Sequence, residues 1–394
     1  MFYKLYHLNT YPFIKRLMRL NAIQLLTNSA IMMSVLFIPL LAQALGASGS
    51  EIGIIVAVYG LMLFISTYIF SRAVESLPPK TLLYAGFLSA TAMFFLQMFA
   101  YDPFSLGVIR ALAGFSIGIY PAVMILYVIN SRKSIGEFSS YMPLGWAVGD
   151  MTVFVVAAYL EVFAADKVSA PGDVYRDVFA LASLFFAVSF LIALTLPDIG
   201  VKSKKKGDYF STAVLKKNRD IYFGFFLRQI GANSVWVIFP LYLVFLGANK
   251  YEVALVYTIN PVLQFFIMRK LDKYDTKSLI HVGDLFSAAA FVALIPITIY
   301  YQAVAGMILI AVSYACLYVG STAFLIKNNE DKGTAAGLLN SSIALASIIG
   351  SILGGIILEL FGFRAVMASG AIFAVLGYVV VRFKKVEKEG NLIK

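Results

Sequence analysis

Residues 45–51 of the chain read Leu-Gly-Ala-Ser-Gly-Ser-Glu, and residues 246–252 read Leu-Gly-Ala-Asn-Lys-Tyr-Glu. Each stretch follows the first long apolar run of its half of the sequence and leads into the second run. Further matches follow in the same order in the two halves: Arg72-x-x-Glu75 aligns with Arg269-x-x-Asp272, Lys80 with Lys277, Gly86 with Gly283, and Glu161 with Glu359. The sequence therefore predicts two halves built to one plan.

The whole chain is far more apolar than a water-soluble protein. Of its 394 residues, 60% are hydrophobic and only 13% are charged, whereas soluble proteins have about 45–50% apolar and about 25% charged residues. An aromatic content of 15% also excludes a disordered chain. A membrane-spanning helix needs about 20 mostly apolar residues. Twelve such runs occur, at residues 22–45, 51–71, 81–100, 104–129, 138–162, 175–196, 221–246, 251–268, 278–300, 303–326, 333–360 and 363–383.

The basic residues orient these spans, because cytoplasmic loops carry an excess of Lys and Arg. With both termini in the cytoplasm, all but six of the 32 Lys and Arg residues fall in the termini and inner loops. The exceptions are Lys167, Arg176, Lys250 and Arg364 on the outer side, and Arg110 and Arg228 within spans. We therefore predict an all-α integral membrane protein with 12 transmembrane helices in two pseudo-symmetric six-helix bundles, both termini cytoplasmic.

The longest polar stretch, residues 197–220, separates the halves. The predicted organisation is a basic N-terminal segment at 1–20, an N-terminal six-helix bundle at 21–198, a cytoplasmic linker at 199–219, a C-terminal six-helix bundle at 220–386 and a C-terminal tail at 387–394. The first twenty residues lack a small-residue cleavage site, so we expect no removable signal peptide.

Several classes of function are disfavoured by what the chain lacks. Two histidines without CxxC or HExxH spacing predict no metal site and no cofactor, and the single Cys316 cannot form an internal disulfide. There is no Walker nucleotide motif and no nucleophile–base constellation, so we expect no enzyme. A basic cytoplasmic face beside anionic lipid accounts for the net charge of +11, so we expect no nucleic-acid partner.

Three short motifs carry a family resemblance. The stretch 71–80 keeps the acid Glu75 and the base Lys80 of a loop signature of the form G-x-x-x-D-R-x-G-R-R, and its second copy keeps Asp272 and Lys277. The helix-four pattern R-x-x-x-G-x-x-x-G is matched by Arg110, Gly114 and Gly118. The antiporter pattern G-P-x-x-G-G is absent from span five, and a relative with Ser for Pro occupies residues 350–355 in span eleven. Over nearly its full length the chain resembles the major facilitator superfamily.

That resemblance implies a transporter in which two bundles rock around a site near the middle of the membrane. It favours a monomer in the cell membrane that binds a small-molecule substrate. The lipid bilayer and protons, or another coupling ion, are the other expected partners.

Ionisable residues inside a bilayer cost about 2.5–3.5 kcal/mol at its centre and normally face a cavity or a partner. Asp150 lies about 12 residues into span five, roughly 18 Å along the helix, and is our candidate for proton coupling. The alternative is a permanent pair of Asp150 with an arginine that fastens two helices. The resemblance implies a proton-coupling role for Arg110, although its usual acidic partner in helix one is missing here. The alternative for Arg110 is a plain interhelical salt bridge.

Arg228 in span seven is followed by Gln229, Asn233 and Trp236, a set that suits an anionic or aromatic organic ligand. The alternative is that Arg228 extends to the cytoplasmic interface. Other polar residues on the predicted cavity helices are further substrate-binding candidates: Asn28, Tyr120, Trp146, Asn260, Gln264 and Asn340. Asp284 and His281 in span nine are expected to pack at the interface.

Charged residues in the matching inner hairpins are candidates for a gate that bridges the two bundles: Glu75, Lys80, Arg269, Asp272 and Lys277. We expect a secondary active transporter that moves a small organic solute by alternating access, coupled to protons and leaning to efflux of amphipathic compounds. The alternatives are a passive facilitator with Arg110 and Asp150 as a fixed pair, an uptake symporter of the same fold, and a non-transport membrane receptor or polytopic enzyme.

Overall fold

The computed structural model describes residues 2–74, 76–131, 134–163, 173–199 and 212–382. Within these ranges the chain is helical and has no strand, as the continuous apolar runs predict. The first half contains α1 (Phe2–Ala44), α2 (Gly49–Ala73), α3 (Pro79–Leu96), η1 (Gln97–Phe99), α4 (Pro103–Ile119), α5 (Pro121–Asn130), α6 (Ile135–Phe163) and α7 (Asp173–Leu194). The second contains α8 (Ala213–Lys217), α9 (Arg219–Phe245), α10 (Lys250–Met268), η2 (Leu271–Lys273), α11 (Thr276–Ala293), η3 (Tyr300–Gln302), α12 (Ala303–Asn328), α13 (Lys332–Phe361) and α14 (Phe363–Arg382).

Three helices differ from the predicted spans by more than a shift of a few residues. Helix α1 begins at Phe2, so the predicted basic segment and the first span form one continuous helix. The fourth span is two helices, α4 and α5, which meet at Pro121, because proline has no backbone N–H and crowds the carbonyl four residues earlier. The ninth span ends as a helix at Ala293, before the predicted residue 300.

The repeated heptapeptide starts a helix in the same way in both halves. The Ser48 hydroxyl accepts a hydrogen bond from the Glu51 N–H at 3.3 Å, and the Ser48 N–H donates to the Glu51 carboxylate at 2.7 Å. Asn249 and Glu252 make the same reciprocal pair at the start of α10, at 3.0 and 2.8 Å. Such a capping box satisfies backbone N–H groups that have no partner inside the helix.

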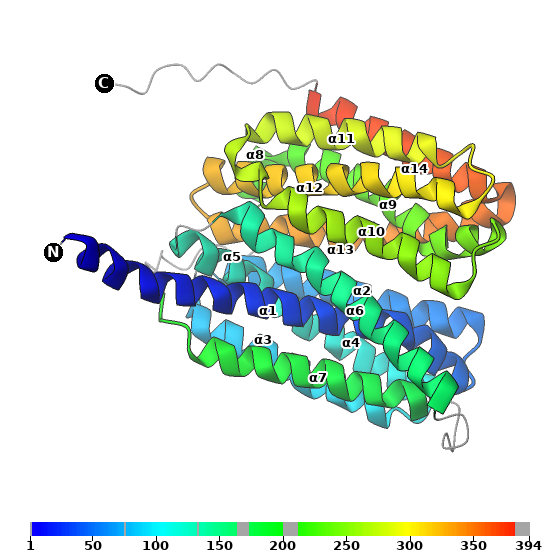
Figure 1. The fold of residues 1–394 in the computed structure, drawn as a ribbon, viewed down its shortest axis with the longest axis horizontal. Helices are drawn as coiled ribbons and strands as arrows, with labels where there is room; N and C mark the ends of the chain where they lie inside the picture. Colours follow the sequence, from blue (N-terminus) through cyan, green and yellow to red (C-terminus); the bar gives the residue numbers. More distant parts are fainter. Residues whose placement is uncertain (1, 75, 132–133, 164–172, 200–211, 383–394) are drawn as a thin grey trace.

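The helices form two groups, and several helix pairs pack across between them (Figure 1). In the first group α1 packs on α6 and α7, α2 on α4, and α3 on α4 and α7; in the second, α9 packs on α13 and α14, α11 on α12 and α14, and α10 on α12. Between the groups, α2 packs on α13 and α6 on α10, and smaller contacts join α5 to α13 and α6 to α12. In the sequence repeat α2 corresponds to α10 and α6 to α13. Exchanging the two halves therefore turns the α2–α13 contact into the α10–α6 contact, as expected for two copies related by a two-fold axis.

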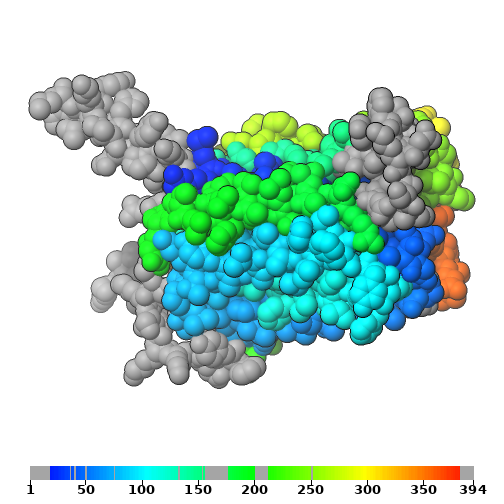
Figure 2. Space-filling view, turned by 90° about the horizontal axis from the view of Figure 1, so that it is seen from below, coloured from blue at the N-terminus to red at the C-terminus, as the bar shows by residue number. Residues whose placement is uncertain are grey.

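The outer surface of the bundle is apolar, and Figure 2 shows α7 beside α3 on one such face. Large apolar side chains there are exposed, among them Leu88 (58%) and Leu184 (55%), which suits contact with lipid rather than water. Among the described residues, eight helical segments are long and apolar enough to cross a membrane. The full count of twelve spans and the cytoplasmic position of the termini stay predictions.

The start of α1, the short helix α8 and the end of α14 lie at one end of the bundle (Figure 1), which we call the inner end. Helices α2 and α13 pack tightly there, because a Cβ added to Gly337 would lie 2.3 Å from the Ser71 Cβ. In the same antiparallel register, Gly53 and Gly355 would face each other near the outer end. A Cβ added to either meets nothing within 4 Å. The two helices therefore contact from the inner end as far as Gly60, where an added Cβ would lie 3.0 Å from Ile348, and leave open space at Gly53 and Gly355.

Candidate functional site

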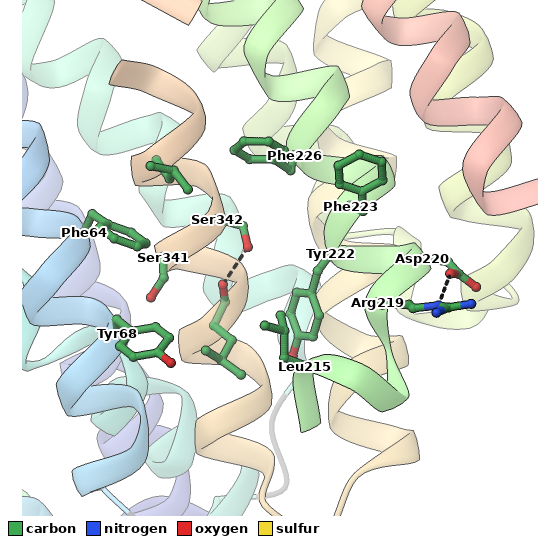
Figure 3. A pocket seen from close by; sticks show the side chains of 12 residues that line it. Phe64, Tyr68, Leu215, Arg219, Asp220, Tyr222, Phe223, Phe226, Ser341 and Ser342 are labelled. Carbon is green, nitrogen blue, oxygen red and sulfur yellow. Dashed lines mark hydrogen bonds and ion pairs between the residues drawn. The ribbon is translucent and has the colours of Figure 1, made fainter. Parts of the chain in front are cut away.

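A cavity of about 620 Å³ lies between the two halves, in their inner part (Figure 3). Helix α2 of the first half forms one side, and α9, α13 and the short α8 form the rest. The lining residues are Phe64, Tyr68, Leu215, Arg219, Asp220, Tyr222, Phe223, Phe226, Leu338, Ser341, Ser342 and Leu345. Phe223 is half exposed on the outside of the bundle, so the cavity extends to the apolar outer surface.

Most polar groups in the cavity wall are already hydrogen-bonded within the protein. The Ser341 hydroxyl donates to the Thr67 hydroxyl at 3.1 Å, a bond between α13 and α2, and the Ser342 hydroxyl donates to the Leu338 carbonyl at 3.0 Å. At the inner edge, Arg219 Nε lies 3.4 Å from Asp220 Oδ1. The cavity thus presents aromatic and aliphatic walls with one ion pair at its rim.

None of the predicted proton-coupling or substrate-binding residues lines this cavity. The sequence did hold a signal for it, because Arg219 and Asp220 stand at the start of an apolar run beside Phe223 and Phe226. Charges at the end of a membrane helix are so common that this signal was not separable from an ordinary interface.

Arg110 is buried inside the first half, with 3% of its surface exposed. Its Nη1 donates to the Ser34 hydroxyl of α1 at 2.9 Å and to the Gln97 side-chain oxygen of η1 at 3.4 Å. The guanidinium carbon lies 3.9 Å from the centre of the Tyr59 ring on α2. Among the described residues no acid pairs with it, so hydroxyl, amide and ring contacts hold the charge. The plain salt bridge that is the alternative for Arg110 is thus not formed within the described part of the chain.

Arg228 of α9 is buried inside the second half and is 1% exposed. Its Nε donates to the Ser287 hydroxyl of α11 at 2.6 Å and its Nη2 to the Ser313 hydroxyl of α12 at 3.1 Å. Its Nη1 donates to the Gln229 side-chain oxygen. Arg228 therefore does not extend to the cytoplasmic interface, and its donors are used inside the bundle.

Asp150 lies apart from both arginines. Its Oδ1 is buried and has no hydrogen-bond partner in the described part of the chain. Tyr257 of α10 is close enough to interact with it electrostatically, and the neighbouring Met151 contacts Thr258 of α10. Asp150 thus stands at the α6–α10 contact between the halves, and the permanent Arg110–Asp150 pair of the passive alternative does not form among the described residues.

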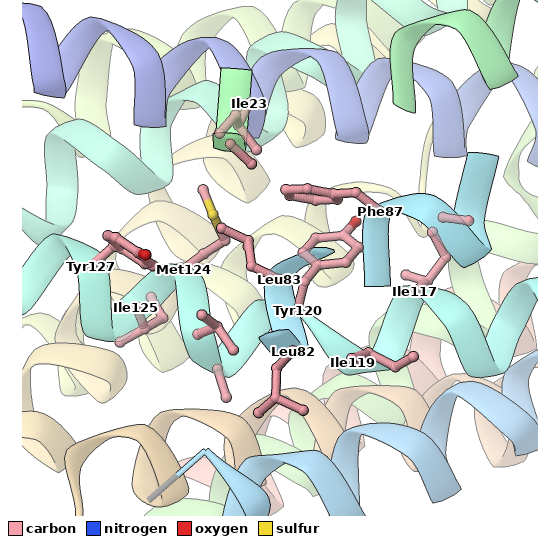
Figure 4. Close-up of a cluster of buried hydrophobic side chains, with 14 of the residues drawn as sticks. Ile23, Leu82, Leu83, Phe87, Ile117, Ile119, Tyr120, Met124, Ile125 and Tyr127 are labelled. Atoms are coloured by element: carbon pink, nitrogen blue, oxygen red, sulfur yellow. The ribbon is translucent and has the colours of Figure 1, made fainter. Parts of the chain in front are cut away.

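The other predicted substrate-binding residues are distributed over both halves. Trp146 of α6 reaches across to Tyr314 of α12, with ring centres 6.0 Å apart, and Trp236 packs on Tyr257 at 5.9 Å. Tyr120 is buried against Phe87 in the core of the first half (Figure 4), a position that packing explains. The amides bond within their own helices: Asn28 to Gln24, Asn233 to Gln229, and Gln264 to Asn260. Asn340 is partly buried on α13.

The inner hairpin between α10 and α11 contacts the start of α6. Arg269 Nη2 lies 3.8 Å from Glu137 Oε1, while Asp272 accepts hydrogen bonds from the Gly136 N–H at 2.9 Å and from the Ser134 hydroxyl. Two predicted gating residues thus bridge the halves, to partners that the sequence analysis had not named. Of the other three, Lys277 lies beside Asp275, Lys80 is partly buried at the start of α3, and Glu75 lies outside the described residues.

The family model of the Major Facilitator Superfamily matches residues 20–259 and 221–393, and so covers nearly the whole chain. The chain belongs to this superfamily. With several helices long and apolar enough to cross a membrane, it is a multi-pass membrane protein. The resemblance found in its motifs is confirmed, and so is the expected all-helical fold of the family.

The chain is similar to other members over most of its length. An uncharacterised MFS-type transporter of Methanocaldococcus jannaschii is 23% identical over 383 residues, which covers 88% of this chain and 92% of that protein. The human organic anion transporter MFSD10 (TETRAN) superposes with a TM-score of 0.77 at 14% identity, covering 94% of this chain and 100% of that one. The E. coli fucose:proton symporter FucP gives 0.71 at 14% identity, covering 95% and 98%. At these identities the solved structures establish the fold.

Proposed function

We propose that this chain is a secondary active transporter that carries an amphipathic organic compound out of the cell through the cell membrane, driven by protons. The observation that carries the proposal is the cavity between the halves, with its aromatic and aliphatic walls and a single ion pair at the rim. Apolar contact contributes about 25 cal/mol per Å² of buried surface and is non-directional. A mostly apolar wall, whose serine hydroxyls are already hydrogen-bonded within the protein, therefore favours an apolar solute with one polar or charged end.

Alternating access is supported by a difference in packing between the two ends of the α2–α13 contact. At the inner end Gly337 packs against Ser71, whereas Gly53 and Gly355 have open space near the outer end. A tightly packed interface switches between two discrete arrangements more readily than it deforms continuously. A rocking motion that closed the outer end would separate Gly337 from Ser71 and break the Ser341–Thr67 bond. The cavity beside Ser341 would then open to the inner side.

The same motion would change the surroundings of Asp150. Asp150 stands where α6 meets α10, one of the contacts between the halves. A carboxyl group favours its neutral form out of water and its charged form in water. Proton uptake and release at Asp150 would therefore follow the closing and opening of the α6–α10 contact. One proton that crosses 100 mV releases about 2.3 kcal/mol, enough for about fifty-fold accumulation.

Purified protein in liposomes with a trapped pH-sensitive dye tests this proposal. The probes are ethidium, an amphipathic cation, and anilinonaphthalene sulfonate, an amphipathic anion. We expect a gradient of one probe to drive proton movement in the wild type. Asp150→Asn, which cannot release a proton, should abolish that movement while probe exchange at equal concentrations continues.

Asp177→Asn is the matched control, because Asp177 is an exposed carboxylate at the start of α7. It should leave both readouts unchanged. Proton-driven transport that persists in Asp150→Asn would contradict the role of Asp150. Probe exchange in the wild type without any proton movement would replace this proposal by the passive facilitator.

A further inference from the structure

Asp284 of α11 is a buried carboxylate that the proposed transport cycle does not use. Only 1% of its surface is exposed, so the expectation that it packs at the interface is wrong. Neither carboxylate oxygen has a hydrogen-bond partner in the described part of the chain. Buried polar atoms almost always have such a partner, and a buried charge without one is especially unfavourable. The position therefore needs an explanation beyond packing.

Arg228 of α9 faces Asp284, and Tyr314 of α12 lies next to that arginine. Arg228 interacts with the carboxylate electrostatically, yet the guanidinium donates its hydrogen bonds to Ser287, Ser313 and Gln229 instead. From α12, the Tyr314 ring lies 5.7 Å from the Arg228 guanidinium carbon. The carboxylate and the arginine thus lie close together without a direct bond.

On the inner side, His281 lies one turn before Asp284 on the same face of α11, since residues three apart are neighbours on a helix. Its Nδ1 is buried and has no hydrogen-bond partner among the described residues, and its ring packs on that of Tyr378 from α14 at 5.7 Å. Measured from Thr276, where α11 begins at the inner end, His281 lies about 8 Å and Asp284 about 12 Å along the helix. A titratable side chain therefore stands between Asp284 and the inner surface.

The first half shows that the arginine does not need the acid. Arg110 is likewise buried and is held by Ser34, Gln97 and the Tyr59 ring. No carboxylate accompanies it there in the described part of the chain. Arg228 has the same kind of support from two serines and a glutamine, so its charge is held without a bond to Asp284.

We propose that Asp284 is a proton-binding site inside the C-terminal bundle, reached from the inner end past His281. The proton binds one carboxylate oxygen of Asp284 and leaves again by way of the His281 imidazole, with no other bond made or broken. With Asp284 neutral, Arg228 stays on Ser287 and Ser313. With Asp284 charged, attraction draws the guanidinium toward it and away from the serines.

This movement of Arg228 links proton binding at Asp284 to the interface between the halves. Arg228 also holds Gln229, whose backbone carbonyl accepts from Asn233, and it faces Tyr314, which packs on Trp146 of the first half. A shift of Arg228 therefore reaches a contact that must change when the halves rock. This consequence for transport rests on the proposed function, whereas the proton site itself does not.

Infrared difference spectroscopy of the purified protein between mildly alkaline and mildly acidic buffer measures the site without transport. We expect a carbonyl band of a protonated carboxyl group in the wild type that is lost in Asp284→Asn. Asp275→Asn is the control, because Asp275 is an exposed acid that caps the same helix, and asparagine keeps the capping oxygen. His281→Gln should keep the band but slow its appearance after a pH jump.

An identical band in Asp284→Asn, or no such band in the wild type, would overturn the proposal. If Asp284→Asn does not fold, Asp284→Glu keeps an acid and must shift the band; an unshifted band refutes the site. In liposomes Asp284→Asn should lose proton-driven accumulation of the probe and keep probe exchange. A wild type without proton-driven transport that still shows the Asp284 band would defeat the proposed function alone. Proton-driven transport that is intact in Asp284→Asn, together with an unchanged band, would defeat this inference alone.

Discussion

Arg269 Nη2 lies 3.8 Å from Glu137 Oε1, and this pair joins the inner hairpin of the second half to the first turn of α6 in the first half. Both side chains are partly exposed, at 39% and 27%, so water and salt screen their attraction. An exposed ion pair contributes at most about 1 kcal/mol. The pair can therefore bias the closed arrangement of the inner end but cannot hold it alone.

Glu137→Gln should shift the equilibrium toward inner opening by at most about fivefold, which corresponds to about 1 kcal/mol. Spin labels at two exposed inner positions, Leu77→Cys in the first half and Tyr274→Cys in the second, report the separation on a Cys316→Ser background. The population with the longer label distance should rise, and high salt should have the same effect on the wild type. The swap Glu137→Arg with Arg269→Glu should restore the original distribution. If the swap behaves like Glu137→Gln, the pair is not the cause.

Gly337→Ala should open the inner end more strongly than loss of the ion pair. The new Cβ would lie 2.3 Å from the Ser71 Cβ and 2.9 Å from its Cα, which forces α13 away from α2. Overpacking of this kind costs about 1–3 kcal/mol, or at least about fivefold in the equilibrium constant. The same spin labels measure the shift. Gly355→Ala is the control on the same helix, because its Cβ meets open space, and an equal rise of the longer distance in that variant would refute the wedge-shaped α2–α13 contact.

The features that sequence predicted well are local in the chain. The repeat at Ser48–Glu51 and Asn249–Glu252 is a pair of capping boxes, whose hydrogen bonds join residues three apart. The lengths of the apolar runs located most helices for the same reason, because the backbone hydrogen bonds of a helix join residues that are close in the chain. The break at Pro121 was also readable in principle, since proline interrupts helical hydrogen bonds wherever it stands.

The candidate site was harder to predict because its contacts join distant helices. Arg228 was singled out, but its partners Ser287 and Ser313 carry no signal in a sequence with many membrane serines. The burial of Asp284 depends on how α11 is rotated against α9 and α12, which the apolar pattern of one helix does not determine. The cavity depends on the tilt of α2 against α13, a property of two packed halves and not of any motif.

The cavity wall predicts a specific loss of probe binding. Phe226→Ala removes an aromatic ring from the wall, and aromatic contacts contribute about 0.5–1.5 kcal/mol beyond their buried area. We expect the affinity for the amphipathic probe that the wild type binds to fall by about tenfold, measured by probe fluorescence with purified protein. Phe266→Ala is the control, because Phe266 is 57% exposed on α10 and does not line the cavity. An equal loss in both variants would show that the probe partitions onto the apolar surface instead.

Asp102 caps the start of α4, one residue before the membrane span Pro103–Asn130 begins. The Asp102 carboxylate accepts a hydrogen bond from the Ser105 N–H at 2.6 Å, and this bond holds the pKa of Asp102 below its ordinary value. A lowered pKa means that the charged form stabilises the fold above the ordinary pKa of an aspartate, and that this stabilisation is lost as the pH falls through the lowered value.

Asp102→Ala removes the cap, so the variant should melt at a lower temperature than the wild type at neutral pH. The difference in melting temperature between the wild type and Asp102→Ala should shrink in acid, because the protonated wild-type carboxyl group is a weaker hydrogen-bond acceptor. Asp102→Asn keeps a capping oxygen that does not titrate, so its margin over the alanine variant should stay constant with pH. Thermal unfolding in detergent across a pH series measures all three proteins. A gap between wild type and Asp102→Ala that is independent of pH would show that the charge on Asp102 plays no part in the cap.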